Sequence, residues 1–335
     1  MQVSKLSKLP EEIVDEELLK IESLKVYHPV RKLFSTIGYI KAVDDVSLKV
    51  RVNEVMAIVG ESGCGKTTLA RAIMKLIPVT SGKMVFNGID ITKLSSHSTH
   101  RWYSRQVGFV QQDPYGAMPS FMSIKTILEE PMRIHKIPKQ ERAKRVIEVL
   151  EEVGLTPPED FTGKYPHMLS GGQLQRVAIA RALVLKPKMI IADEPVSMLD
   201  ASVRIEILNL FRELQARYKT AVIYITHDFA TAKYFSDKIS VMYAGQLVEL
   251  GSAKEVINNP KHPYTQALIN VLPDPDPENR FKLKRTLPGE PPNLMRPPPG
   301  CRLAPRCPFV MEKCQKEDPP FFNVSNRLVK CWLYE

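Results

Sequence analysis

Gly60-Glu-Ser-Gly-Cys-Gly-Lys-Thr67 is the stretch of sequence that decides the fold. It follows a short apolar run over residues 55–59 and precedes a helical pattern over residues 67–77. Glycines let backbone N–H groups turn inward towards an anion, and the following helix presents its positive end. Lys66 adds a point charge, and the Thr67 hydroxyl is a ligand for magnesium. The stretch therefore predicts a cradle for a triphosphate.

Most of the chain alternates between short apolar runs and helical stretches. The runs cover residues 54–59, 107–110, 189–192 and 221–226, which predicts a mostly parallel sheet covered by helices, hence an α/β fold. Residues 122–155 depart from this alternation, because apolar side chains repeat there at helical spacing. Pro138 begins one helix and Gly154 ends it, so we expect a helical insertion.

Two further signals accompany the phosphate cradle. Asp193 and Glu194 follow the run 189–192, so both carboxylates emerge where α/β sheets place their sites. Asp193 is suited to magnesium, and Glu194 to accepting a proton from an attacking water. Leu169-Ser-Gly-Gly-Gln173 begins another helix with small residues and a hydroxyl. Taken alone, this stretch is better explained by a plain helix cap than by a second phosphate-binding end, but its combination with the other motifs reverses that preference.

Together these motifs resemble the nucleotide-binding subunit of ABC transporters over nearly all of residues 20–260. The resemblance makes residues 60–67 the Walker A loop, residues 169–173 the signature and residues 197–200 the D-loop. It implies catalytic roles for Glu194, His227 as the switch histidine and Gln112 in Val110-Gln-Gln-Asp-Pro114. Tyr27 is expected to stack on adenine, with Tyr39 as the second choice. Cys64 is expected to fill space without a catalytic role.

The resemblance implies ATP and Mg²⁺ as ligands. Thr67, Gln112 and Asp193 are the implied magnesium ligands. The residues implied in binding the nucleotide are Tyr27, Gly60, Glu61, Ser62, Gly63, Cys64, Gly65, Lys66, Thr67, Thr68, Ser170, Gly171, Gly172, Gln173, Asp193 and Asp200.

The same resemblance implies an assembly. Each ATP lies between the phosphate loop of one copy and the signature of another, so we expect a homodimer or a heterodimer with a sister subunit. Two membrane permease subunits and an extracytoplasmic solute-binding protein complete it, with residues 113–167 as the docking surface for the permeases. The expected location is peripheral, on the cytoplasmic face of the cell membrane.

Composition changes near residue 258, which we take as a domain boundary between residues 1–258 and 259–335. Of the 27 prolines, 15 lie between Pro260 and Pro320, which predicts a linker around residues 273–277 and a small loop-rich module. The stretch from His262 to Cys331 resembles the tail of the peptide and oligopeptide importer branch; related systems import nickel or oligosaccharides. For His262 itself, a helix-start role before Pro263 is the expected physical one.

Four cysteines lie in this module: Cys301, Cys307, Cys314 and Cys331, with the spacing C-x5-C-x6-C-x16-C. A cytoplasmic chain disfavours disulfides, and structural zinc sites usually show closer pairs. Four thiolates without such pairs suit an iron–sulfur cluster, and members of the resembling branch carry [4Fe–4S] on a similar set. Zn²⁺ is the second alternative and free thiols are the third.

Length and charge set limits on the function. The 335 residues predict roughly two domains. No apolar run is long enough to cross a bilayer, and residues 1–15 lack the apolar core of a signal peptide. A net charge of +10 would suit anionic lipid or nucleic acid. Three features disfavour an ATPase that acts on nucleic acid. The sequence has a single cassette, it has no long coiled coil, and it has no basic run interleaved with aromatic residues.

Overall fold

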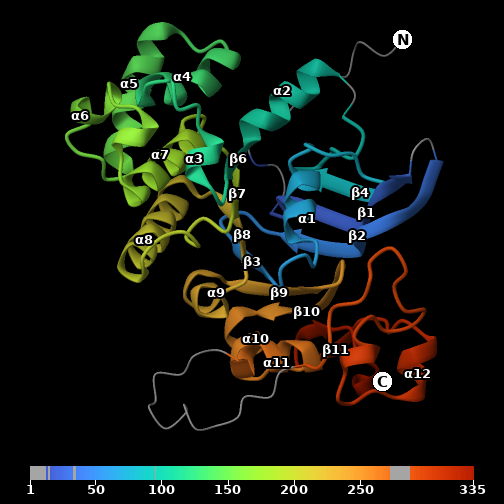
Figure 1. Ribbon diagram of the computed structural model, residues 1–335. Coiled ribbons are helices and arrows are strands. Elements are labelled where there is room, and N and C mark those ends of the chain that lie inside the picture. Colours follow the sequence, from blue (N-terminus) through green and yellow to red (C-terminus); the bar gives the residue numbers. More distant parts are fainter. Residues whose placement is uncertain (1–12, 14–15, 33–34, 95, 272–286) are drawn as a thin grey trace. The chain divides into compact units, whose positions relative to one another are not determined.

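The computed structural model describes residues 13, 16–32, 35–94, 96–271 and 287–335 (Figure 1). The predicted linker at residues 273–277, and all but residue 13 of the N-terminal stretch 1–15, lie outside these residues. The chain forms two compact units, each built from segments that are separated in sequence. The first contains residues 50–54 and 86–224 with the described residues up to Leu19, and the second contains residues 20–49, 55–85 and 225–335.

In the first unit, Asp193 and Glu194 lie at the end of one strand of a parallel pair. β6 (Val107–Val110) and β7 (Met189–Asp193) pair in parallel with Val110 opposite Ala192, and β8 (Ala221–Thr226) lies next to β7. Every residue of β7 and β8 is buried, as expected for parallel strands covered on both faces. α2 (His97–Gln106) leads directly into β6, and β5 (Ile89–Asp90) precedes it.

The predicted helical insertion is confirmed. After α3 (Pro114–Ala117) come α4 (Ile124–Ile134), α5 (Lys139–Glu152) and α6 (Glu159–Thr162), then a 3₁₀ turn at Pro166–Met168. Pro138 is the N-cap of α5, and Gly154 takes a φ of 72° just after its end. α4 and α5 pack on each other and on α7 (Gly171–Leu183), which in turn contacts α8 (Ala201–Tyr218) (Figure 1).

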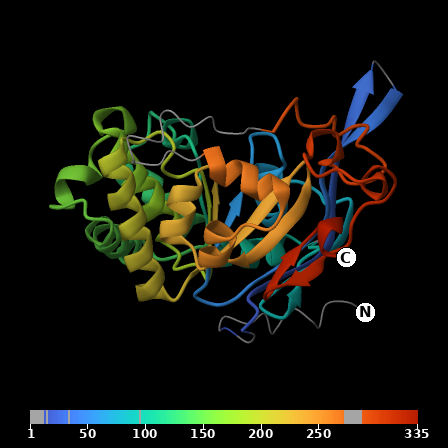
Figure 2. The same cartoon turned by 90° about the horizontal axis from the view of Figure 1, so that it is seen from below.

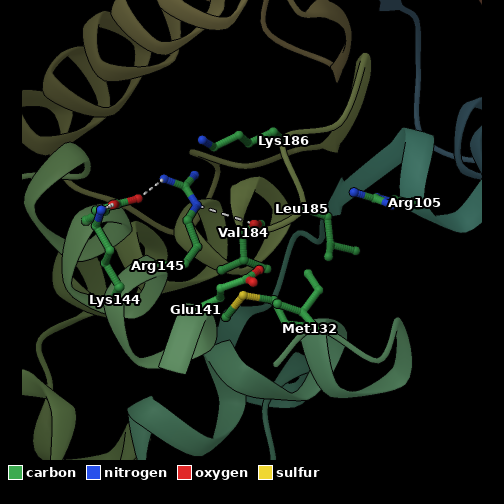
Figure 3. Close-up of a pocket in the computed structure, with 10 residues that line it drawn as sticks. Arg105, Met132, Glu141, Lys144, Arg145, Val184, Leu185 and Lys186 are labelled. Carbon is green, nitrogen blue, oxygen red and sulfur yellow. Dashed lines mark hydrogen bonds and ion pairs between the residues drawn. The ribbon is translucent and has the colours of Figure 1, made fainter. Parts of the chain in front are cut away.

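Arg145 of α5 holds the end of α7 (Figure 3). Its guanidinium donates from Nε to the Val184 carbonyl at 3.3 Å and from Nη2 to the Leu183 carbonyl at 3.1 Å. Carbonyls at a helix C-terminus lack intrahelical partners and carry partial negative charge, so a buried cation stabilises them. Nη1 also pairs with Glu152 Oε1 at 3.0 Å, and the side chain borders a cavity of about 320 Å³. Arg145 therefore fixes the helix that begins at the signature.

Replacing Arg145 with Met should destabilise the protein by about 2–4 kcal/mol, because the largely buried Glu152 would lose its nearer cation and keep only Arg217 at 3.9 Å, while the carbonyls at the end of α7 would lose their donor. Chemical denaturation of the full chain measures this free energy of unfolding. The neighbouring Lys144 is the matched control, since its side chain is 82% exposed. Lys144→Met should change the free energy by less than about 0.5 kcal/mol; equal losses in both variants would contradict the anchoring role.

The second unit contains two groups of strands. β1 (Leu19–Lys32), β2 (Ser35–Val50) and β4 (Ser81–Phe86) lie in the order β2-β1-β4. The other group has the order β11-β12-β10-β9-β3, made of β3 (Val55–Val59), β9 (Lys238–Tyr243), β10 (Gln246–Ser252), β11 (Phe322–Val324) and β12 (Arg327–Val329).

The prediction of a mostly parallel sheet is only partly right. β3 pairs with β9 in parallel, but β9, β10, β12 and β11 pair in antiparallel fashion. Two tight turns account for two of the three antiparallel pairs: Ala244 and Gly245 join β9 to β10, and Ser325 and Asn326 join β11 to β12, all four with positive φ. Two-residue turns of this kind match the twist of antiparallel hairpins.

Short helices cover this second strand group. α1 (Lys66–Ile73) follows β3, while α9 (Phe229–Phe235) contacts β3 and α10 (Ala253–Asn258) contacts β9 and β10 (Figures 1 and 2). α11 (Pro263–Val271) and α12 (Glu312–Lys316) belong to the C-terminal region. Across the described ranges, no helix is both long enough and apolar enough to span a membrane.

The start of α11 is fixed by a buried carboxylate. Glu249 of β10 is fully buried; it accepts the N–H groups of Lys261 and His262 at 3.0 and 2.9 Å and pairs with Arg327 at 3.5 Å. His262 Nδ1 in turn accepts the N–H of Tyr264 at 3.2 Å. Burial lowers the pKa of His262 from 6.5 to about 3, so this imidazole is neutral. The helix-start role predicted for His262 is confirmed.

Candidate nucleotide site

The phosphate loop, residues 60–67, connects β3 to α1 in the second unit. Gly65 is the N-cap of α1 with a φ of 108°, a conformation that glycine adopts without steric cost. A Cβ at Gly65 would lie 2.1 Å from the Ala42 carbonyl oxygen, and one at Gly60 would lie 2.1 Å from that of Met242. Neither position accepts a side chain, because the loop backbone packs directly against its neighbours.

Lys66 places its charge inside this loop. Its side chain is 5% exposed, and Nζ donates to the carbonyl oxygens of Gly60 at 2.7 Å and Glu61 at 2.9 Å. Cys64 is also buried, with its sulfur 3.8 Å from the ammonium, and burial raises the pKa of its thiol. A neutral, enclosed thiol agrees with the space-filling role predicted for Cys64. Ser62, Gly63 and Thr67 are exposed, and Thr68 is half-buried.

Tyr264 and Arg306 hold the loop through Glu61, and the sequence did not indicate either of them as a site residue. Glu61 donates its backbone N–H to Tyr264 Oη at 2.9 Å, and its carboxylate pairs with Arg306 Nη1 at 3.2 Å. Tyr264 and Arg306 are more than 200 residues away in sequence. No local pattern points from either residue to the loop, and only the fold brings them there.

In the first unit, Gln112 and Glu194 meet directly. Gln112 Nε2 donates to Glu194 Oε2 at 3.1 Å, so two residues predicted to be catalytic are brought together. Glu194 has a φ of 49°, a conformation that is strained for a residue with a side chain. Its carbonyl accepts the N–H of Ser197 at 3.2 Å and the Ser197 hydroxyl at 3.0 Å, which fixes the turn after β7. Asp193, the last residue of β7, is buried.

The signature stretch is a helix cap in this structure. Ser170 is the N-cap of α7: its hydroxyl accepts the N–H of Gln173 at 3.3 Å, and Gln173 Oε1 accepts the N–H of Ser170 at 3.1 Å. This reciprocal pair is a capping box. A Cβ on Gly172 would lie 2.9 Å from Val203 of α8, whereas Gly171 has ordinary contacts. Asp200, in the predicted D-loop, is the exposed N-cap of α8.

His227 and Tyr27 belong to the second unit. His227 is exposed in the bend between β8 and α9, and Asp228 caps α9 by accepting N–H groups from Ala230 and Thr231. Tyr27 is half-buried; its hydroxyl donates to Asp44, and burial raises its pKa. Lys41 Nζ lies 5.9 Å from the centre of its ring. Tyr39 is 52% exposed. The choice of Tyr27 over Tyr39 for adenine stays a prediction.

The four cysteines of the C-terminal region are all free thiols, with Cys314 and Cys331 buried and Cys301 and Cys307 partly so. The Cys301 N–H donates to the Cys314 carbonyl at 2.8 Å. Burial raises the pKa of Cys301 to about 12 and that of Cys331 to about 11, so these thiols are protonated. Among the described residues, no three His, Cys, Asp or Glu side chains are placed to hold a metal ion. The arrangement does not support the predicted cluster.

Comparisons with known proteins give the family. Residues 43–197 match the family described as "ABC transporter", and residues 248–314 match "Oligopeptide/dipeptide transporter, C-terminal region". The chain is 40% identical to the oligopeptide transport ATP-binding protein AppF of Bacillus subtilis (strain 168), over 95% of this chain and 98% of that one. It is 37% identical to the dipeptide transport ATP-binding protein DppF of Escherichia coli (strain K12), over 97% of each.

Two solved structures are also similar to this chain in fold. cbiO1 from Clostridium perfringens, part of an ABC transporter complex, aligns with a TM-score of 0.63 at 31% identity, covering 73% of this chain and 92% of its own. A dimeric ATP-binding cassette bound to ADP and Pi aligns with a TM-score of 0.62 at 29% identity, covering 70% of this chain and 98% of its own.

The phosphate loop and these matches define the class: a P-loop nucleotide-binding protein with the ATP-binding cassette fold. The chain belongs to the ABC transporter family, and its relatives are ATP-binding proteins of that family. The predicted resemblance is thereby confirmed, and with it the prediction of an ABC-type ATPase. The proline-rich, cysteine-containing module is not confirmed as a separate part of the fold.

Lys66→Ala should weaken ATP binding by roughly 100-fold, because charge-assisted contacts to phosphate are worth about 2–3 kcal/mol. Titration of the full chain with a fluorescent ATP analogue measures the dissociation constant. Lys254→Ala removes an exposed lysine of α10, in the same unit and outside the loop, and is expected to change that constant less than threefold. Unchanged binding by Lys66→Ala would remove the loop from the site.

Proposed function

We propose that this chain is the ATP-binding and ATP-hydrolysing subunit that powers import of di- or oligopeptides through separate membrane subunits. The observation that carries the proposal is similarity along nearly the whole length of both chains to oligopeptide and dipeptide transport ATP-binding proteins. The match of residues 248–314 to the C-terminal region of such transporters supports the same branch. Import of nickel or oligosaccharides by the same mechanism is the alternative.

Within this proposal, residues 60–67 bind the phosphates of ATP. Backbone N–H groups and the Lys66 ammonium supply the positive field, and the loop is kept in shape by the close approaches at Gly60 and Gly65. The hydroxyl of Thr67, the carboxylate of Asp193 and the amide oxygen of Gln112 are hard oxygen donors of the kind magnesium prefers. Bound Mg²⁺ would neutralise charge that develops on the phosphates.

Glu194 is the proposed acceptor for the proton of the attacking water. Its carboxylate receives a hydrogen bond from Gln112, and its strained backbone is held by Ser197. A residue held in this way is pre-organised, so its carboxylate needs little rearrangement during hydrolysis. We assign His227, in the bend after β8, a contact to the terminal phosphate.

Glu194→Gln should reduce ATP hydrolysis by at least about 100-fold while ATP still binds, because the cradle is untouched and only the proton acceptor is lost. The variant should then accumulate as an ATP-bound dimer in size-exclusion chromatography. Glu206→Gln, on the exposed surface of α8, is the matched control and should hydrolyse ATP at the wild-type rate. Wild-type turnover by Glu194→Gln would overturn the assignment.

The proposed assembly is a dimer of cassettes on two permease subunits at the cytoplasmic face of the membrane, served by an extracytoplasmic solute-binding protein. Within the signature, Ser170 is exposed and residues 171–173 are partly exposed at the start of α7, which suits contact with the nucleotide of a second copy. The dimeric state of the solved ATP-binding cassette bound to ADP and Pi supports a dimer of cassettes. The second copy is either this chain or a sister subunit. No nucleic-acid partner is proposed.

Transport by the purified complex tests the function. The tagged chain is isolated from its own membranes in mild detergent, reconstituted in vesicles with the subunits that copurify, and supplied with the solute-binding protein. ATP-dependent uptake of labelled di- or oligopeptides is expected. Uptake of nickel or of an oligosaccharide instead would change the substrate. Retention on a salt-sensitive nucleic-acid column without membrane subunits would overturn transport.

A [4Fe–4S] cluster on Cys301, Cys307, Cys314 and Cys331 is a separate part of the proposal. Its support is the family resemblance and the number and spacing of the cysteines in the sequence, not their arrangement in the structure. Anaerobically purified protein should be brown with about four iron per chain, and Cys314→Ser should lose both. Cys64→Ser is the control, because Cys64 lies outside the set. Stoichiometric zinc without iron would select the zinc alternative, and absence of both metals would leave free thiols.

A further inference from the structure

Arg306 is built into the C-terminal region as a fixed cation beside the phosphate loop. Its side chain is buried, with Nε donating to the Pro288 carbonyl at 3.0 Å and Nη1 lying 3.4 Å from the Tyr243 hydroxyl. The guanidinium also lies over the Tyr243 ring, 5.9 Å from its centre. These contacts fix the plane of the guanidinium, so the position of the carboxylate that it pairs with is fixed too.

That carboxylate belongs to Glu61, the second residue of the phosphate loop. Its N–H is held by Tyr264, so the residue is fixed at both its backbone and its side chain. A carboxylate in a loop that binds phosphate is electrostatically unfavourable, because like charges repel and water screens them less in partly buried surroundings. Arg306 removes this repulsion by neutralising Glu61.

A second arginine of the same segment contacts the neighbourhood of the loop. Arg302 is buried and donates to the Asp44 carboxylate and to the Ala244 carbonyl. The next residue, Gly245, donates its N–H to the Cys64 carbonyl at 2.8 Å. A small cavity of about 50 Å³ is lined by loop residues 61–64 and by residues 291, 292 and 294. The C-terminal region therefore borders the phosphate loop at this place too.

We propose that Arg306 is a positioning residue of the phosphate loop: it neutralises and orients Glu61, so that the segment from Cys301 to Cys307 sets the affinity for ATP. The inference rests on the proposed function, in which the loop binds ATP. It adds a role for the C-terminal region that neither the loop motif nor the transport function requires. Arg302 follows Cys301 and Arg306 precedes Cys307, so both arginines lie in the segment that these two cysteines bound.

Arg306→Gln should weaken binding of a fluorescent ATP analogue to the full chain by about tenfold at low salt. The cause of the weaker binding is the Glu61 carboxylate, left unpaired. Because salt screens its repulsion of the phosphates, the loss of ATP affinity should shrink to less than about threefold near 0.5 M salt. Glu61→Gln introduced into Arg306→Gln should restore binding to within about threefold of wild type, since no unpaired carboxylate remains. A merely structural arginine would show neither the salt dependence nor the rescue.

Arg142→Gln is the matched control. It breaks the partly buried pair with Glu129 between α4 and α5, so it should lower the unfolding temperature while leaving the ATP dissociation constant within about twofold. Glu61→Gln alone provides a test that does not depend on the folding of an Arg306 variant. It should bind ATP more tightly than wild type at low salt, because the loop loses a negative charge and keeps its backbone N–H groups, and tenfold weaker binding would overturn the proposal.

Failure of this inference is distinguishable from failure of the proposed function. If Lys66→Ala loses ATP binding but Arg306→Gln binds as wild type, the loop binds ATP and Arg306 has no positioning role. If Arg306→Gln weakens binding but Glu61→Gln does not rescue it, the role assigned to Glu61 is wrong. If the wild-type chain itself binds no ATP, the proposed function fails first.

Discussion

The backbone of the phosphate loop passes so close to its neighbours that two of its residues have no room for a side chain. At Gly60 the obstacle is a carbonyl of β9, and at Gly65 it is a carbonyl of β2. The loop is therefore shaped by backbone contacts that substitution cannot adjust. Because Lys66 follows directly, the same contacts decide where its ammonium lies. The position of the charge depends on this constraint.

Buried charges in this protein join segments that are distant in sequence. Arg145 links α5 to the end of α7, Glu249 links β10 to α11 and β12, and Arg306 links the C-terminal region to the phosphate loop. A charge removed from water is tolerated only when partners surround it. Each such group therefore specifies one arrangement of its segments, because any displacement would leave a charge unpaired.

The C-terminal region is where sequence reasoning was least complete. Its prolines correctly indicated little regular structure, yet β11 and β12 extend the strand group that contains β3. Strands of three residues carry too weak an alternation to be recognised beside prolines and cysteines. The cysteine spacing suggested a metal site, but among the described residues the cysteine side chains are not placed to hold a metal ion. Spacing along the chain gave their number and order; it could not give the direction of their side chains.

The sequence by itself determined the strand–loop–helix at residues 55–73, the acidic pair after β7, the helical insertion and, through the motifs, the family. These features are local, because glycines, a lysine and periodic apolar residues within about twenty positions dictate them. Only the tertiary structure decided that β10 to β12 run antiparallel, that Gln112 meets Glu194, and that Tyr264 and Arg306 hold Glu61. Each of these depends on which distant segment packs against which, and the free energy that decides it comes from burial and charge pairing across the whole fold.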